Sequence, residues 1–164
     1  MWLSERRRFL VSIAGLLAGA CGFSPALEPG GALRLLDRSV VVAEPRNTNE
    51  FLLSGAFQSR FGPPDTPKYR MQYQLRLSFS GAGITPDNET TRGEITGVLT
   101  YTLLDLPTGL ELRTETVRTL TGYGRSGTTA ASEFAREDAI ERTIEILADL
   151  AISDLIASRV EWAS

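Results

Sequence analysis

Residues 69–79, which read YRMQYQLRLSF, decide the fold. Apolar and aromatic side chains alternate with polar ones over the whole stretch, and a period of two residues is typical of a strand with one buried face. The other face of such a strand contacts water or a polar partner. The sequence places four polar side chains on that other face: Arg70, Gln72, Gln74 and Arg76.

Two more strands are expected further along the chain. Residues 92–105 and 110–121 carry apolar and β-branched side chains, and the segment between them, LPTG at 106–109, has the composition of a tight turn. A polar segment containing Gly, Pro, Asp and Asn at 81–91 is expected to be a loop. Links of this length predict an antiparallel meander of three strands.

One strand and one helix are expected before the meander. Three consecutive valines lie within residues 39–43, and a proline follows them closely, so we expect a short strand there. Asn47 or Thr48 can cap a helix, and Glu50 lies three residues after Asn47, as in a capping box. This helix is expected to end at Gly62 because glycine and proline commonly follow a helix.

A long helix is expected over residues 130–158. Apolar side chains recur there at spacings of three and four residues, which is the helical period: Ile140, Ile144, Leu147, Ala151 and Leu155. The preceding segment, 122–129, contains GYGR at 122–125, which comes nearest in this chain to a phosphate-binding loop. We interpret it as a flexible lead-in to the helix, since such loops are common.

The predicted fold class is α+β. About four mostly antiparallel strands and two helices favour a two-layer sandwich in which both helices pack on one face of the sheet. The chain has 164 residues, enough for one domain and a short extension. We therefore predict a single domain over residues 32–164.

Composition removes several classes of function. The chain has no histidine, which excludes Ser-His-Asp catalysis and histidine metal sites, and its one cysteine excludes an internal disulfide. A formal net charge of -3 disfavours binding to nucleic acid through overall charge. The sequence therefore predicts no catalytic residues, no metal site and no cofactor.

Residues 1–20 are predicted to be a signal peptide. Three consecutive arginines at 6–8 precede a mainly apolar run at 9–18, and small residues then lead to Cys21. This order of basic, apolar and small residues is that of a secretory signal. The apolar run is shorter than the roughly 20 residues that cross a bilayer. The arginines leave the general secretory and twin-arginine export routes both open.

Cys21 is the predicted lipidation site. The segment LAGAC at 17–21 resembles a bacterial lipobox, although Ala18 stands where a leucine is usual. The alternative is a free thiol, which is a liability in an oxidising compartment. Gly22 follows the cysteine, and the absence of an aspartate there points to the outer membrane. Residues 21–31 are then the lipidated N-terminus and a tether rich in Gly and Pro.

The arginines of the predicted sheet form a candidate anion-binding patch. Arg70 and Arg76 share one strand face, and Arg92, Arg113 and Arg118 lie on the neighbouring strands. Guanidinium groups bind phosphate and carboxylate with two parallel hydrogen bonds. The alternative is that these arginines are scattered and only keep the protein soluble, as most exposed charges do.

The chain resembles the LPS-assembly lipoprotein family LptE in its alphaproteobacterial form. The start CGFSP at 21–25 resembles the first residues of the mature family members. FAREDAIER at 134–142 is similar to their last helix, and YTLLD at 101–105 to their central hairpin. The predicted order of strand, helix, three strands and long helix is also similar. The resemblance covers most of the mature chain.

The resemblance implies a non-catalytic function in the cell envelope. Members of the family are anchored in the outer membrane facing the periplasm, plug the large β-barrel LptD, support its assembly and bind lipopolysaccharide during its insertion into the outer leaflet. The expected partners are therefore an LptD-type barrel, lipopolysaccharide and the membrane itself. As our own hypothesis from the residues, Arg70, Arg76 and Arg92 contact lipopolysaccharide.

Two other interpretations stay open on the sequence alone. The same anchor and domain suit a scaffold lipoprotein in another envelope secretion or lipid-transport complex. A carboxylate-based hydrolase acting on the cell wall is the second alternative, and Glu137 and Asp138 are the densest acidic pair. Adjacent residues on a helix point in different directions, so a solvated helix face explains that pair more simply.

Overall fold

The computed structural model describes residues 32–84, 90–125 and 128–163. The predicted signal peptide, Cys21 and the tether lie outside the described residues. Within the described ranges, no helix combines the length and apolar composition that crossing a bilayer requires. The elements in chain order are α2 (Ala32–Leu36), β1 (Val40–Val42), α3 (Thr48–Phe61), β2 (Tyr69–Ile84), β3 (Thr90–Asp105), β4 (Glu111–Gly124), α4 (Thr129–Ala157) and α5 (Arg159–Trp162).

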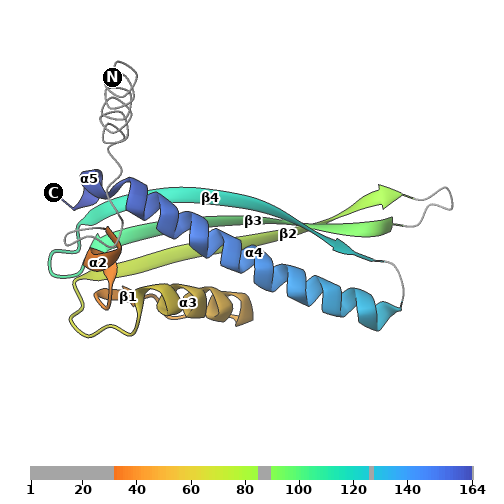
Figure 1. The fold of residues 1–164 in the computed structure, drawn as a ribbon, viewed down its shortest axis with the longest axis horizontal. Coiled ribbons are helices and arrows are strands. Elements are labelled where there is room, and N and C mark those ends of the chain that lie inside the picture. Colours follow the sequence, from red (N-terminus) through yellow and green to blue (C-terminus); the bar gives the residue numbers. More distant parts are fainter. Residues whose placement is uncertain (1–31, 85–89, 126–127, 164) are drawn as a thin grey trace, which may run out of the picture.

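The strands form one mixed sheet in the order β1-β2-β3-β4. β1 runs parallel to β2, to which it connects through α3, and the other two pairs are antiparallel. Figure 1 shows the sheet as a long twisted ribbon, with α4 crossing one face diagonally and α3 beside the first half of β2. The predicted α+β sandwich with helices on one face is confirmed, and two short helices, α2 and α5, are added to it.

The two ends of this elongated molecule differ. We call the end that holds α2, β1 and α5 the base (Figure 1). The opposite end, the tip, holds the far part of the β2–β3 hairpin, the end of β4 and the start of α4. The core cluster draws on both long helices and on the helix-facing side of the sheet. Its largest fully buried members are Tyr101, Phe57, Phe61, Leu36, Leu53, Met71, Leu99, Leu103, Ile144, Leu147 and Leu155.

The strands are longer at the tip than the sequence predicts. β2 continues to Ile84, and β4 continues to Gly124. The predictions that loops begin at residues 81 and 122 were therefore wrong, because both positions belong to strands. Gly81 pairs with Gly93, and Gly93 pairs in turn with Tyr123. Because ladder hydrogen bonds use only the backbone, glycines that favour a loop reading can still extend a hairpin.

The predicted start of α3 is confirmed. The Asn47 side chain accepts a hydrogen bond from the Glu50 backbone N–H at 3.0 Å, and Gly62 ends the helix with a φ of 74°. The Glu50 carboxylate accepts from the backbone N–H and the guanidinium of Arg46. The hydrogen bond from the Arg46 side chain lowers the pKa of the buried Glu50 carboxyl. The cap thus keeps a buried carboxylate charged and fully bonded.

α4 approaches the sheet closely at Gly97 of β3. A Cβ atom added to Gly97 would lie 2.7 Å from Cγ2 of Thr143 and 2.8 Å from Cδ1 of Leu147. Both of these α4 residues are fully buried. Glycine is therefore required here by the close approach of the helix rather than by the backbone conformation.

A polar cluster ties the end of α4 to the sheet near the base. The Arg113 guanidinium binds Asp154 of α4 through two hydrogen bonds of 2.6 and 2.9 Å, and Glu161 of α5 at 2.6 Å. The hydroxyl of the fully buried Tyr101 donates to the same Asp154 carboxylate. The hydrogen bond from Arg113 lowers the pKa of the Asp154 carboxyl. We call Tyr101, Arg113, Asp154 and Glu161 the base cluster.

Candidate functional site

The sheet face that turns away from the helices is uncovered by any other described element. We call it the open face. The predicted side of β2 lies on it, since Arg70, Gln72, Gln74 and Arg76 are all exposed. Cross-strand pairing places the corresponding side chains of the neighbouring strands on the same face: Thr96, Val98, Thr100 and Thr102 of β3, and Thr114, Thr116, Arg118 and Leu120 of β4.

Threonine hydroxyls pair across the middle of the open face. The Thr100 and Thr116 hydroxyl oxygens are 2.9 Å apart, and those of Thr102 and Thr114 are 2.7 Å apart. Cross-strand threonine pairs of this kind stabilise a sheet modestly. Their remaining hydrogen-bonding capacity, together with the two glutamine amides of β2, makes the open face a polar surface able to bond a second protein or a polar ligand.

The arginines of the open face are spread along it. Arg76 follows Arg70 by six positions on β2, which is about 20 Å at the rise of a strand. Arg76, Val98 and Arg118 form one row across three strands, with the two arginines about 10 Å apart at the backbone. Among the described residues, no ion pair involves Arg70, Arg76 or Arg118.

The prediction that groups Arg113 with the outward arginines is wrong. Arg113 lies on the helix side of the sheet, in the base cluster, where 17% of its side chain is exposed. A register shift at Leu103/Leu104 leaves Leu112 as an extra residue on β4. Leu112 packs against the core although it adjoins Arg113. The bulge lies beyond Arg113, and the pairing is regular from Gly124 to Arg113. Arg113 is five positions from Arg118, so simple alternation along the strand already places the two arginines on opposite faces.

Arg92 lies near the tip, far from the other two predicted lipopolysaccharide contacts. It pairs with Ala82 of β2, which is twelve positions and about 40 Å along the strand from Arg70. It lines a hollow of about 650 Å³ together with Thr91, Glu94, Leu120, Gly122, Tyr123 and Gly124. The structure therefore keeps all three predicted arginines on the open face but does not bring them together into one site.

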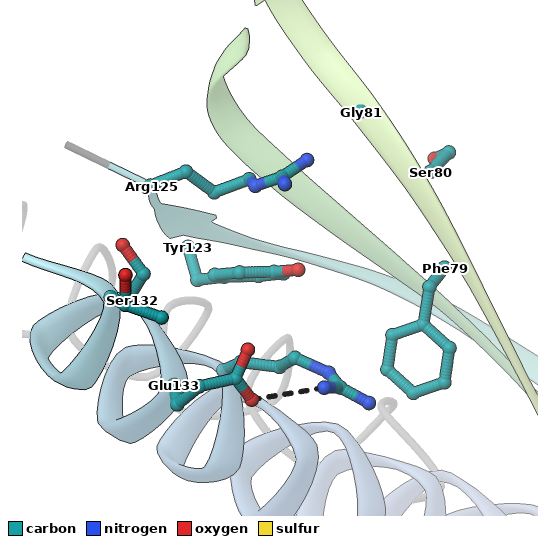
Figure 2. Close-up of a pocket in the computed structure, with 9 residues that line it drawn as sticks. Phe79, Ser80, Gly81, Tyr123, Arg125, Ser132 and Glu133 are labelled. Atoms are coloured by element: carbon teal, nitrogen blue, oxygen red, sulfur yellow. Dashed lines mark hydrogen bonds and ion pairs between the residues drawn. The ribbon is translucent and has the colours of Figure 1, made fainter.

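A second hollow, the tip cavity, lies on the helix side of the same end. It has a volume of about 560 Å³ and lies between the ends of β2 and β4 and the first turns of α4. Figure 2 shows Tyr123 and Arg125 extending from the end of β4 toward Phe79 on β2, with Ser132 and Glu133 opposite them on α4. The full lining is Phe79, Ser80, Gly81, Tyr123, Arg125, Thr129, Ser132, Glu133 and Arg136.

The Tyr123 ring is seated on a glycine. A Cβ atom at Gly93 would lie 2.2 Å from Cζ and 2.4 Å from Cε1 of Tyr123, so the ring lies flat against the β3 backbone. Any larger residue at position 93 has to push the ring out of this place. The glycine therefore fixes one wall of the tip cavity.

The two arginines of the tip cavity have different surroundings. The Arg136 guanidinium lies 4.8 Å from the centroid of the Phe79 ring and donates to the Glu133 carboxylate at 3.0 Å. Arg125 has no ion-pair partner among the described residues. Two guanidinium groups and one carboxylate give the cavity a local excess of positive charge in a chain of net charge -3.

Comparison with known proteins gives relatives by structure only. No family model and no curated protein matches the sequence. A candidate lipoprotein from Caulobacter crescentus CB15 is similar, with a TM-score of 0.60, 22% identity, and coverage of 79% of this chain and 96% of that one. The rare lipoprotein B of Shewanella oneidensis has a TM-score of 0.59 at 11% identity, over 77% and 98% of the two chains. This chain has their fold.

A third solved structure agrees with the first two. A minor lipoprotein from Acinetobacter baumannii has a TM-score of 0.50 at 16% identity and covers 74% of this chain and 90% of that one. The matched portion spans nearly the whole of each of these proteins, so they share one complete domain of this architecture. At such low identity the likeness carries the fold, and no residue roles follow from it.

Sequence reasoning missed most of the tip cavity. Phe79 closes the alternating stretch and was assigned to the buried face, yet 46% of it is exposed because the core lies toward the base. The GYGR segment was noted, but as a flexible lead-in, whereas three of its residues belong to β4. The usable signal was the close spacing of Tyr123 and Arg125, since side chains two apart on a strand point to the same face.

Proposed function

We propose that this chain is a lipoprotein of the outer membrane that plugs an LptD-type β-barrel, supports its assembly and binds lipopolysaccharide without catalysing a reaction. The observation that carries the proposal is the open face, a polar and cationic surface that runs along the sheet. A polar sheet face is stable in water and stays free to contact a partner, and a plug needs an extended surface of this kind against a barrel wall.

The fold and the sequence support the same proposal independently. The structural relatives are described as lipoproteins, one of them as rare lipoprotein B. The residues 17–21 resemble a lipobox and residues 134–142 resemble the last LptE helix. Fully extended chain between Cys21 and Ala32, the first residue of the base, spans at most about 40 Å, so an anchor at Cys21 would hold the base within that distance of the membrane. The tip then projects about 50 Å beyond the base, the length of β2.

The distribution of charge suits a plug that also binds an anionic lipid. Arg70, Arg76 and Arg118 lie on the open face, whereas the outward side of α4 is acidic. Lipopolysaccharide carries phosphates, which guanidinium groups bind with two parallel hydrogen bonds. The exposed acidic residues of α4 are Glu133, Glu137, Asp138, Glu141, Glu145 and Asp149. We propose Arg70, Arg76 and Arg92 as the contacts on the open face.

Co-purification tests the proposal. The full chain, tagged after Ser164, is recovered from outer membranes solubilised in mild detergent, and the proteins that accompany it are identified. We expect one large β-barrel in near-equal amount. Recovery without a barrel contradicts the proposal, and recovery with an inner-membrane complex favours a scaffold of another envelope system instead. A chain with Cys21→Ser separates loss of the anchor from loss of the partner.

A further inference from the structure

We infer that the tip cavity is a binding site for a phosphorylated sugar, with Arg125 and Arg136 toward the phosphate and the Tyr123 ring against the sugar. The inference deepens the proposed function and rests on it for the natural source of this ligand. It assigns binding to residues on the helix side of the tip, separate from Arg70, Arg76 and Arg92 on the open face.

The charge of the cavity selects an anion. Arg125 is exposed and has no ion-pair partner among the described residues, so its guanidinium is available to a ligand. Arg136 is held in place from two sides, by the Phe79 ring at 4.8 Å and by Glu133 at 3.0 Å. A fixed cation beside an available one favours a compact anion with several oxygens, such as a phosphate ester.

The first turn of α4 adds to this selection. The helix begins at Thr129, which lines the cavity, and it is 29 residues long. Backbone N–H groups at a helix start carry partial positive charge. Thr128 caps one of them, the Ala131 N–H, at 3.2 Å. Thr129 and Ser132 also line the cavity, and their hydroxyls can supply further hydrogen bonds to oxygen atoms of a bound ligand.

The aromatic walls favour a sugar over bare phosphate. Tyr123 and Phe79 both line the cavity, and an aromatic face packs well against the C–H face of a pyranose ring. A volume of about 560 Å³ accommodates a sugar ring with its phosphate, whereas bare phosphate would leave most of the space filled with water. Gly93 keeps the Tyr123 ring in place, so this wall is formed before a ligand arrives.

A lipid-linked phosphosugar and a free sugar phosphate share this chemistry. The apolar surface at the tip favours the lipid-linked form. Phe79 is 46% exposed, Leu120 61% and Phe134 72%. Large apolar side chains left in water at the same end as the cavity match the acyl chains of an amphiphile. The test therefore includes both a soluble and a lipid-linked probe.

The test is a titration of the isotope-labelled full chain in detergent micelles, followed by NMR. Glucose 1-phosphate is the soluble probe, with glucose and inorganic phosphate as partial ligands. We expect saturable shifts at the backbone amides of Arg125, Ser132 and Arg136, which line the tip cavity and not the hollow at Arg92, and weaker binding of either partial ligand. Arg125→Gln is expected to lower the affinity for glucose 1-phosphate about tenfold. The matched control, Arg142→Gln, removes an α4 arginine outside the cavity and leaves the affinity unchanged.

A second variant separates binding from folding. Gly93→Ala displaces the Tyr123 ring and is expected to lower the affinity for glucose 1-phosphate. The indole N–H signal of Trp162, in the base, is expected to keep its position, which shows that the variant is folded. Equal affinity of Arg125→Gln and the unchanged chain overturns the inference. So does a set of shifts centred on the side-chain amide of Gln74, which reports the open face.

Purified lipopolysaccharide is the lipid-linked probe, and it separates this inference from the proposed function. Lipopolysaccharide that shifts Gln74, with no shift at Ser132 from either probe, contradicts the tip site and leaves the proposed function standing. Glucose 1-phosphate that shifts Ser132 in a chain that ignores lipopolysaccharide supports the tip site and contradicts the proposed natural ligand. Shifts at Ser132 from both probes support both.

Discussion

Replacing Arg113 with alanine is expected to lower the free energy of unfolding by about 3 kcal/mol. The reason is the base cluster, in which Arg113 satisfies the Asp154 carboxylate with two hydrogen bonds and also binds Glu161. Asp154 is 26% exposed, and Tyr101 beside it is fully buried, so water replaces the lost guanidinium poorly. Urea denaturation followed by circular dichroism measures the change.

The matched control for this variant is Arg118→Ala. Arg118 lies on the same strand but on the open face, and no ion pair among the described residues involves it. Its removal is expected to change stability by less than about 0.5 kcal/mol. Equal losses in the two variants would mean that the base cluster contributes no more than an exposed arginine does.

Acid titration gives the base cluster a second signature. The pKa of the Asp154 carboxyl is lower in the folded protein than in the unfolded chain, mainly because of its hydrogen bond with Arg113. The folded state then gains stability above the unfolded pKa, about 4, and loses it as the pH falls through the folded pKa. In Arg113→Ala, the free energy of unfolding should therefore fall less steeply as the pH drops below about 4. The decrease that comes from Glu50, whose pKa is also lowered, should remain.

The second large effect is expected from Gly97→Val. The new side chain meets Thr143 and Leu147 of the closely packed α4, since even a Cβ atom comes within 2.7 Å of Thr143. Overpacking a filled core of this kind costs about 3 kcal/mol because the helix has to move or the side chains must leave their rotamers. Thermal unfolding of the variant should show a single transition at a clearly lower midpoint.

Gly55→Ala is the control for Gly97→Val. Gly55 lies within α3 and a Cβ atom there would meet nothing within 4 Å. Alanine at such a helix position is expected to stabilise the protein by about 0.5 to 1 kcal/mol. A Gly97→Val chain as stable as the unchanged one would show that α4 does not rest on β3 at this point.

The fold follows from the sequence where a single period holds over many residues. The alternation over residues 69–79 fixed both the strand and its polar side, because a shift of one residue would bury Arg70 and expose Met71. The long helix and the Asn47 cap were predicted for similar reasons, since their signals are local. The parallel pairing of β1 with β2 depends on contacts distant in sequence, and no local pattern predicted it.

The candidate site was less predictable because it depends on irregular features. Gly81, Gly93 and Gly122 continue the strands, and a glycine gives no side chain from which to infer a face. The face of Arg113 was predictable, because it is five positions from Arg118 on a regular part of β4, whereas the bulge at Leu112 was not. The tip cavity is lined by residues of β2, β4 and α4, which lie close together because the long helix packs across the sheet. This proximity depends on tertiary structure, so no local sequence pattern predicts it.

Site-specific photo-crosslinking in cells tests whether the open face contacts a β-barrel. A photoreactive residue replaces Gln74 in the middle of the open face, and a second chain carries it at Glu141 on the acidic side of α4. We expect the Gln74 position to yield one dominant adduct with an outer-membrane β-barrel protein, stronger than any adduct at the Glu141 position. If the Gln74 position gives no adduct, or adducts only with soluble or inner-membrane proteins, the open face does not contact a barrel.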